Sequence, residues 1–348
     1  MSPSITSEID SLLDVSARIG GNPLLVQAAT GNTSLKLDGV LWIKASGKWL
    51  ARAAQDDILI PVDLARTRER IARNSDPAGD SVVVNGERLG TSVETAMHAV
   101  LPARVVLHVH SVSVIALAVR RDGRAELAAR LAGLDWQWIP YLPSGLPLAR
   151  EIAAVVERFP ATRVLVLANH GLVVCGETCA EAEELLREIE RRVAIEPRRA
   201  AEPNWAVLAG LTEHTHWQMP ASVELHSMGT DEIARRIVCG GILYPCQSIF
   251  LTARALCFPQ TVSPGVLAGI DEPFVLIEGA GVLVRANASS TQSATLAGLA
   301  QVLRRIPDSA PVEYLREDQV QQLLCADVYH YREMVEHNGG MLSSPSRG

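Results

Sequence analysis

Two histidines separated by one residue, His108 and His110, are the feature of the sequence with the clearest chemistry. The run 104–110 (RVVLHVH) is rich in β-branched residues, which predicts a strand. Because side chains two residues apart on a strand point to the same face, the two imidazoles would lie close together. Neighbouring imidazoles are typical ligands of a divalent metal ion. An H-x-H pair alone is more often a packed or surface feature, so the metal hypothesis needs a third ligand.

A third imidazole is available in Asn169-His170-Gly171, a segment that predicts a sharp turn between two strands. The glycine permits close approach of the backbone at this turn. Catalytic metal sites commonly have three protein ligands and one open position, a count that His108, His110 and His170 would satisfy. The sequence therefore predicts a three-histidine site built from a strand and a turn.

Glu94 lies four residues before His98 on a helix predicted for 92–100, so the two side chains share one face. A carboxylate beside a three-histidine metal could bind the ion or serve as a general base. The alternative is an ordinary surface pair, which by itself is the better interpretation. A second H-x-H pair, His214 and His216, lies outside any predicted strand and is a weaker candidate for metal binding.

Two segments of small residues could bind an anion. The first, 31–34 (GNTS), precedes a predicted strand, and the second, 44–47 (KASG), follows one. Glycines expose backbone N–H groups, and Ser, Thr and Asn side chains add further donors. Lys44 would add a positive charge. Neither segment is a phosphate loop or a dinucleotide fingerprint, and the alternative is that both are ordinary turns.

These candidate residues are distributed over alternating helices and strands, which favours a layered α/β fold. Asp38-Gly39 predicts a tight hairpin between strands. Other strands are predicted at 163–167, 172–174, 274–277 and near 242–251, and helices at 7–19, 63–73, 148–158, 178–195, 231–239 and 290–305. The charged, proline-containing run 196–204 is the best candidate boundary, and we expect domains at 1–200 and 201–348.

An internal similarity links the two halves of the chain. A shift of 110 residues places 164–174 (VLVLANHGLVV) over 274–284 (FVLIEGAGVLV). Gly171 then matches Gly281, but His170 meets Ala280. One interpretation is that a strand–turn–strand–helix unit is generic; the other is a degenerate partial repeat whose second copy has lost its chemistry. The second interpretation predicts that Ala280 occupies the turn position of His170.

Composition excludes several classes of protein. The 348 residues are 48% hydrophobic and 20% charged, as in globular proteins and unlike disordered chains. The net charge is −7 and no block of Lys and Arg stands out, which argues against a nucleic-acid partner. The six cysteines form no C-x-x-C, the N-terminus is acidic, and no run reaches about 18 apolar residues. We therefore expect a cytoplasmic protein with neither a signal peptide nor a membrane span.

Taken in chain order, these motifs resemble those of the class II aldolase/adducin family. They are GNTS at 31–34, IKASG at 43–47, SVETAMH at 92–98, HVH at 108–110 and NHGLVVCG at 169–176. LWIKASGKWL (41–50) and ETAMHAVLP (94–102) are most similar to the aldolase half of bifunctional rhamnulose-phosphate aldolase/dehydrogenase proteins. The resemblance implies a three-layer α/β/α fold with a central, mostly antiparallel sheet, followed here by a C-terminal α/β extension. It also implies a homo-oligomer, with a tetramer favoured.

The resemblance assigns a role to each motif. It implies a divalent ion, usually Zn2+, on His108, His110 and His170, with Glu94 as the catalytic glutamate. It implies a phosphate pocket at Asn32, Ser46, Gly47 and Ser92, beside the charge of Lys44. Val93 stands where sugar-phosphate aldolases have a second serine. Tyr141 is a candidate proton donor by its position in the sequence.

The expected function is metal-dependent cleavage of a ketose or ketose phosphate through a stabilised enediolate. A sugar epimerase, decarboxylase or dehydratase with the same metal site is the first alternative. A non-catalytic adducin-like interaction module is the second, which the presence of the three histidines and Glu94 disfavours. An amidohydrolase barrel needs eight βα units, and a cupin needs a nearly all-β chain; the predicted elements fit neither.

Overall fold

The chain folds into two compact units in the computed structural model, which describes residues 3–77, 83–84, 90–324 and 335. Unit 1 comprises 1–118 and 124–194, and unit 2 comprises 119–123 and 195–348. No described helix has both the length and the apolar character needed to cross a lipid bilayer.

Unit 1 is built on a seven-stranded sheet with the order β3-β2-β1-β4-β7-β6-β5. Every neighbouring pair is antiparallel except β5 and β6, so the expected mostly antiparallel sheet is confirmed. The predicted turn at Asp38-Gly39 joins β1 to β2, with φ of 50° and 79° at these two residues. The strands are β1 (Asn32–Leu37), β2 (Val40–Lys44), β3 (Leu59–Asp63), β4 (Val105–Val109), β5 (Trp136–Ile139), β6 (Val164–Leu167) and β7 (Gly171–Gly176).

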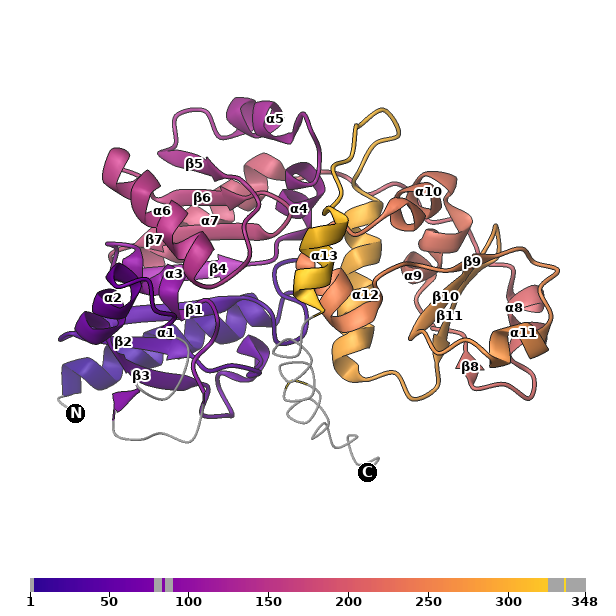
Figure 1. Ribbon diagram of the computed structural model, residues 1–348, viewed down its shortest axis with the longest axis horizontal. Coiled ribbons are helices and arrows are strands. Elements are labelled where there is room, and N and C mark those ends of the chain that lie inside the picture. Colours follow the sequence, from indigo (N-terminus) through magenta and orange to yellow (C-terminus); the bar gives the residue numbers. More distant parts are fainter. Residues whose placement is uncertain (1–2, 78–82, 85–89, 325–334, 336–348) are drawn as a thin grey trace. The chain divides into compact units, whose positions relative to one another are not determined.

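Helices cover both faces of this sheet and complete the three layers (Figure 1). The first layer, α2 (Leu64–Ala72), α3 (Thr95–Val100) and α6 (Leu146–Arg158), packs on buried side chains such as Ile43 and Val173. The opposite layer contains α1 (Pro3–Gly20), α4 (Val112–Ala118) and α7 (Cys179–Val193). The 3-10 turn Leu50–Arg52 follows β2, and α5 (Gly123–Arg130) precedes β5.

Unit 2 contains a smaller sheet with the order β8-β11-β10-β9. Its strands are β8 (Trp217–Gln218), β9 (Cys257–Phe258), β10 (Phe274–Ile277) and β11 (Gly281–Arg285). Its helices are α8 (Trp205–Thr212), α9 (Val223–Thr230), α10 (Glu232–Gly240), α11 (Pro264–Ala268), α12 (Ser290–Leu303) and α13 (Glu317–Leu323), with a π-helical turn at Gln247–Leu251.

The strand predicted near 242–251 is wrong. Pro245 and Cys246 begin a helical turn that runs into the π-helical segment Gln247–Leu251. A short apolar run is compatible with either a buried strand or a buried helix, because periodicity cannot separate the two. Proline in the first helical turn sacrifices no hydrogen bond, and here it favours the helix.

The two halves share strand order, strand direction and register. Val164 pairs with Val174 in the β6–β7 hairpin, and Phe274 pairs with Val284 in the β10–β11 hairpin, with an offset of 110 residues at both positions. The order β8-β11-β10-β9 repeats β4-β7-β6-β5, including the one parallel pair at the edge. The N–H of Ala280 donates to Ile277, as that of His170 donates to Leu167. Ala280 therefore holds the turn position of His170, as the repeat interpretation predicted.

Lys36 on β1 is a buried cation in unit 1, and it makes stability depend on pH. Its ammonium donates to the Ala103 carbonyl at 2.8 Å, and burial lowers its pKa to about 8. Between that value and the ordinary pKa of about 10.4 for lysine, the unfolded chain holds a proton that the folded chain has released. Stability relative to Lys36→Met should therefore rise by about 2 kcal/mol between roughly pH 7.5 and 9.5. Urea unfolding across this range checks the expectation, and a difference independent of pH would contradict it.

Candidate metal centre

Four side chains from three segments converge at one end of β4. One ligand atom from each of Glu94, His108, His110 and His170 lies within 4.8 Å of the others. The centroids of the three imidazole rings are 5.0–5.1 Å apart. All four residues are at most 9% exposed, so the cluster is shielded from bulk water.

β4 and its neighbours set the position of His108. Its backbone is paired with Asn32 of β1 on one side and Val173 of β7 on the other. Its Nδ1 lies 3.0 Å from the Leu172 carbonyl, which can only accept a hydrogen bond, so Nδ1 carries the proton. In a neutral ring, Nε2 then presents a lone pair to the cluster, as a metal-ligating histidine requires.

The donor set fits a divalent cation. Nε2 of His108 lies 3.0 Å from Oε1 of Glu94 and 3.2 Å from Nε2 of His110. Nε2 of His170 lies 3.5 Å from the same carboxylate oxygen. Three imidazole nitrogens and a carboxylate oxygen at these separations offer lone pairs that a shared cation would satisfy.

The charge states also suit metal binding. Burial lowers the pKa of His110 and of His170, and the adjacent ring of His108 lowers both further. Burial by itself raises the pKa of Glu94, but His108 and His170 outweigh burial and hold this pKa well below its usual range. These pKa values keep His110 and His170 neutral and Glu94 ionised, which are the protonation states in which such groups bind metals.

Glu94 is positioned by the start of α3. It is the residue before the first helical residue, Thr95, and its N–H donates to the hydroxyl of Ser92 at 3.2 Å. His98, four residues on, turns to β1 instead: its Nδ1 lies 2.7 Å from the Ser34 hydroxyl, and burial lowers its pKa to about 3. Within the described residues, Nε2 of His98 has no hydrogen-bond partner.

Asn32 is the anion-site candidate that lies against the cluster. It faces His108 across β1 and β4, so both side chains are on the same face of the sheet. The residue is fully buried, and among the described residues neither Nδ2 nor Oδ1 of its amide has a partner. A buried amide without a hydrogen-bond partner costs free energy, unless a water or a ligand supplies that hydrogen bond.

The other candidate residues are not members of the cluster of Glu94, His108, His110 and His170. Lys44 is buried, donates at 2.9 Å to the carbonyls of both Ala29 and Lys48, and has a pKa lowered by burial to about 8. Ser46 donates its N–H to Gly90, and Gly47 adopts a left-handed φ of 71°. Tyr141 lies between β5 and α6, outside the group of four. In unit 2, Nε2 of His216 contacts Arg285 at 2.8 Å.

The sequence did not reveal the role of Ser34. It shares a face of β1 with Asn32, two residues away, and it carries the hydrogen bond to His98. The GNTS motif contains both residues, so strand alternation was the available signal. The partner on α3 could not be identified, because 64 residues separate it from Ser34.

Gly171 allows β7 to approach the ligand strand, and its substitution should be costly. A Cβ atom there would lie 2.5 Å from the Val109 carbonyl oxygen and 3.3 Å from Cε1 of His108. We expect Gly171→Ala to lower the free energy of unfolding by about 2 kcal/mol and the melting temperature by roughly 4–8 °C. The control is Gly210→Ala in α8, where a Cβ would meet nothing within 4 Å. Thermal unfolding tests the pair, and equal melting temperatures would exclude a steric role for Gly171.

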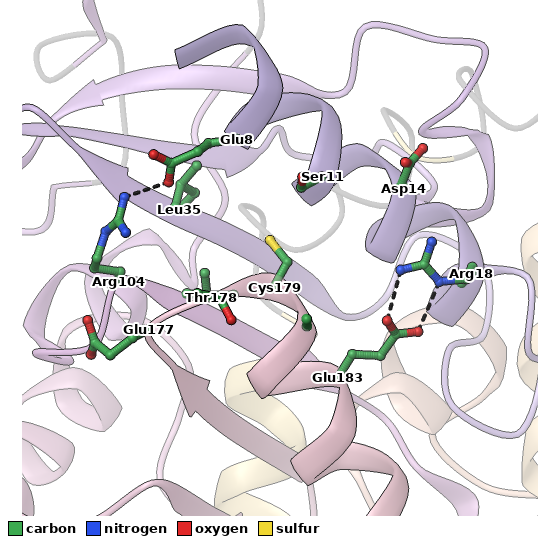
Figure 2. A pocket seen from close by; sticks show the side chains of 12 residues that line it. Glu8, Ser11, Asp14, Arg18, Leu35, Arg104, Glu177, Thr178, Cys179 and Glu183 are labelled. Carbon is green, nitrogen blue, oxygen red and sulfur yellow. Dashed lines mark hydrogen bonds and ion pairs between the residues drawn. The ribbon is translucent and has the colours of Figure 1, made fainter. Parts of the chain in front are cut away.

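A separate cavity of about 530 Å³ lies between α1 and α7 (Figure 2). Two ion pairs border it, Arg18 with Glu183 and Arg104 with Glu8. None of the four clustered residues lines this cavity, so it is not part of the candidate metal centre.

Comparison with known proteins identifies the family to which unit 1, the unit with the cluster, is similar. The family model described as Class II Aldolase and Adducin N-terminal domain matches residues 11–196, more than half of the chain. The uncharacterized oxidoreductase YuxG of Bacillus subtilis is 28% identical over 185 residues, which cover 49% of this chain but only 27% of that protein. The methylthioribulose-1-phosphate dehydratase of Microcystis aeruginosa is 27% identical over 177 residues, covering 46% of this chain and 80% of that protein. The solved N-terminal class II aldolase domain of a conserved Thermoplasma acidophilum protein is 27% identical, with a TM-score of 0.46, and covers 53% of this chain and 92% of that one.

Proposed function

Because the chain belongs to the class II aldolase and adducin N-terminal domain family, we propose that it is a metal-dependent lyase acting on a ketose or ketose phosphate. The observation that carries the proposal is the buried group of three imidazoles and one carboxylate in unit 1. An interaction module without catalysis has no need to keep an ionised glutamate and three lone-pair donors together in its interior. We assign catalysis to 1–200, which contains the whole group.

His108, His110 and His170 would hold the ion. Zn2+ is the proposed metal, since three histidines with one open position are typical of catalytic zinc. When bound, a divalent ion supplies Lewis-acid stabilisation of the negative charge that develops on a substrate carbonyl oxygen. The Leu172 carbonyl fixes the tautomer of His108 and thereby keeps Nε2 available to the ion.

Glu94 is the proposed acid–base group. Its carboxylate is ionised and 3.0 Å from His108, so it can take or return a proton at the substrate carbon beside the carbonyl. The amide of Asn32, which has no hydrogen-bond partner among the described residues, would donate a hydrogen bond to a substrate oxygen. Ser92, Ser46 and Gly47 are the proposed remainder of the anion subsite, and Tyr141 is the proposed proton donor. The ammonium of Lys44 donates to the carbonyls of Ala29 and Lys48, so we propose that Lys44 stabilises the 45–48 loop.

A dehydratase reaction is the second candidate, favoured by the relative from Microcystis aeruginosa, whose name specifies that activity. Both reactions pass through an enediolate, but they form it in different ways. In dehydration, the carbon beside the carbonyl loses a proton to give the enediolate, and the β-hydroxyl then leaves as water. In aldol cleavage, the β-hydroxyl loses its proton and the carbon–carbon bond breaks, which gives the aldehyde and the enediolate together.

The test combines metal analysis of the purified protein with a screen of free ketoses and ketose phosphates. The proposal expects about one divalent ion per chain and a reaction that stops on chelation. Release of an aldehyde identifies the aldolase reaction, and a product lighter by one water identifies the dehydratase. A protein that binds no divalent metal would contradict both candidates. Light scattering on the same sample tests the accompanying proposal of a homotetramer.

A further inference from the structure

Two cysteine side chains are neighbours in unit 2, whereas the histidine cluster belongs to unit 1. Cys239 lies near the end of α10, and Cys257 is the first residue of β9. The two thiols are near enough for each to shift the pKa of the other. Cys257 is exposed and Cys239 is half-buried, so a small solute can reach the pair.

Backbone geometry supports this contact independently. Phe258 packs with Val275 and Ile277 in the core cluster on one face of the small sheet. Because strand side chains alternate, Cys257 points to the opposite face, where α9 packs on β10 and β11 and α10 packs on α9.

An ion pair holds α10 against this end of the sheet. Arg235, one helical turn before Cys239, contacts the carboxylate of Glu278 at 3.2 Å. The N–H of Glu278 donates at 2.8 Å to the carbonyl of Phe258, the residue next to Cys257. The two cysteines are therefore placed by a helix and a strand that are tied to each other.

The two thiols differ in pKa, and this difference predicts which sulfur is the nucleophile. A hydrogen bond with Cys257 lowers the pKa of Cys239 to about 7 against the effect of burial, with help from Arg235 and Arg254. The same hydrogen bond raises the pKa of Cys257. At neutral pH about half of Cys239 is therefore the nucleophilic thiolate, while Cys257 stays a thiol.

The other described cysteines have different surroundings. Burial raises the pKa of Cys175 and of Cys179 to about 11, and Cys246 is buried. Cys325 lies outside the described residues. Among the described cysteines, Cys239 is therefore the one whose environment favours the reactive thiolate.

We propose that Cys239 and Cys257 form a reversible disulfide site that reacts with hydroperoxides. The Cys239 thiolate attacks the peroxide O–O bond and takes one oxygen, which gives a sulfenic acid, and the other oxygen leaves as an alcohol, or as water from hydrogen peroxide. The sulfur of Cys257 then attacks the sulfenic sulfur, an S–S bond forms, and water leaves. The two thiols lose two electrons in total, and the peroxide gains them. A low-molecular-weight thiol reverses the change by disulfide exchange.

The experiment treats the reduced full-length protein with one equivalent of hydrogen peroxide, blocks the remaining thiols and maps the peptides by mass spectrometry. The expected product links the peptides of Cys239 and Cys257, with the loss of two hydrogens. In Cys257→Ser, Cys239 should accumulate as a sulfenic acid that dimedone traps. Cys239→Ser should react at least ten times more slowly than the wild type.

Cys179→Ser is the matched control, because it removes a half-buried thiol in unit 1 and should leave the cross-link unchanged. Circular dichroism of each variant establishes that it is folded. Two results would overturn the proposal: oxidation that joins other cysteines first, or a Cys239→Ser variant that consumes peroxide as fast as the wild type. Neither readout involves the lyase reaction, so failure here leaves the proposed function untouched.

Discussion

Replacing His170 with alanine is expected to abolish metal binding and to slow the proposed lyase reaction by about a thousandfold or more. The variant retains two imidazoles and loses the ligand contributed by the turn between β6 and β7. A divalent ion contributes several kcal/mol to stabilising a developing oxyanion, and each 1.36 kcal/mol corresponds to a factor of ten in rate. Elemental analysis after dialysis, with turnover measured on the same sample, tests both expectations.

The turn of the β10–β11 hairpin gives a reason to expect that the His170→Ala variant folds. Ala280 occupies the corresponding turn of the β10–β11 hairpin and makes the same hydrogen bond to the residue three positions earlier. An alanine is therefore compatible with this turn, and loss of metal from His170→Ala would reflect the missing ligand. His214→Ala is the control, because His214 is exposed and outside the cluster, and it should keep full metal content and rate. Stoichiometric metal in His170→Ala would refute the assignment of the ligands.

The parts of the site that follow local rules could be predicted from the sequence. His108 and His110 share a face through the two-residue alternation of a strand, and His170 follows from an Asn-His-Gly turn between two apolar runs. Asn169 has a φ of 51°, a left-handed conformation for which asparagine is among the most tolerant residues. These features depend on neighbouring residues only, so periodicity and turn chemistry are sufficient to find them.

The parts that depend on packing between distant segments could not be predicted in this way. The alignment of Asn32 with His108 follows from the register of β1 on β4, which no local pattern encodes. Lys44 shows the same limit: local pattern places a lysine beside a glycine turn, but only the fold shows that its ammonium is buried and donates to the Ala29 and Lys48 carbonyls. Burial decides whether a charged group faces a ligand or supports a loop, and burial is a property of the whole fold.

The β10–β11 hairpin shows that this architecture can form without the histidine of the turn. Both hairpins have the same register and the same hydrogen bond at the turn, because apolar strands and a glycine are enough to form them. No counterpart of β1–β3 pairs with β8 in the described part of unit 2, where β8 is the edge of its sheet. The strand that carries Asn32 thus has no equivalent in that sheet. The hairpin fold therefore does not depend on the residues of the candidate site.

Replacing Glu94 with glutamine is expected to lower kcat by a factor of about 10² to 10⁴ while the bound metal remains. Glutamine has nearly the same shape, so it preserves packing at the start of α3, but its amide cannot accept and return a proton. A positioned general acid or base contributes a rate factor of this size. A group that transfers a proton stabilises the transition state and not the bound substrate, so its effect should appear in turnover and not in KM. Steady-state kinetics and elemental analysis of the same preparation provide the measurement.

Glu183→Gln is the matched control, because Glu183 is also a buried carboxylate in unit 1 but pairs with Arg18 beside the α1–α7 cavity. It should keep its kcat and lose about 1 kcal/mol of stability, the typical upper value for a partly exposed ion pair. If Glu94→Gln loses its metal together with its rate, Glu94 is a metal ligand, since a proton carrier does not govern affinity for the ion. If Glu94→Gln turns over like the wild type, the proton must move through another group. Only a variant that keeps its metal and loses its rate separates the proton transfer of Glu94 from the ion binding of the three histidines.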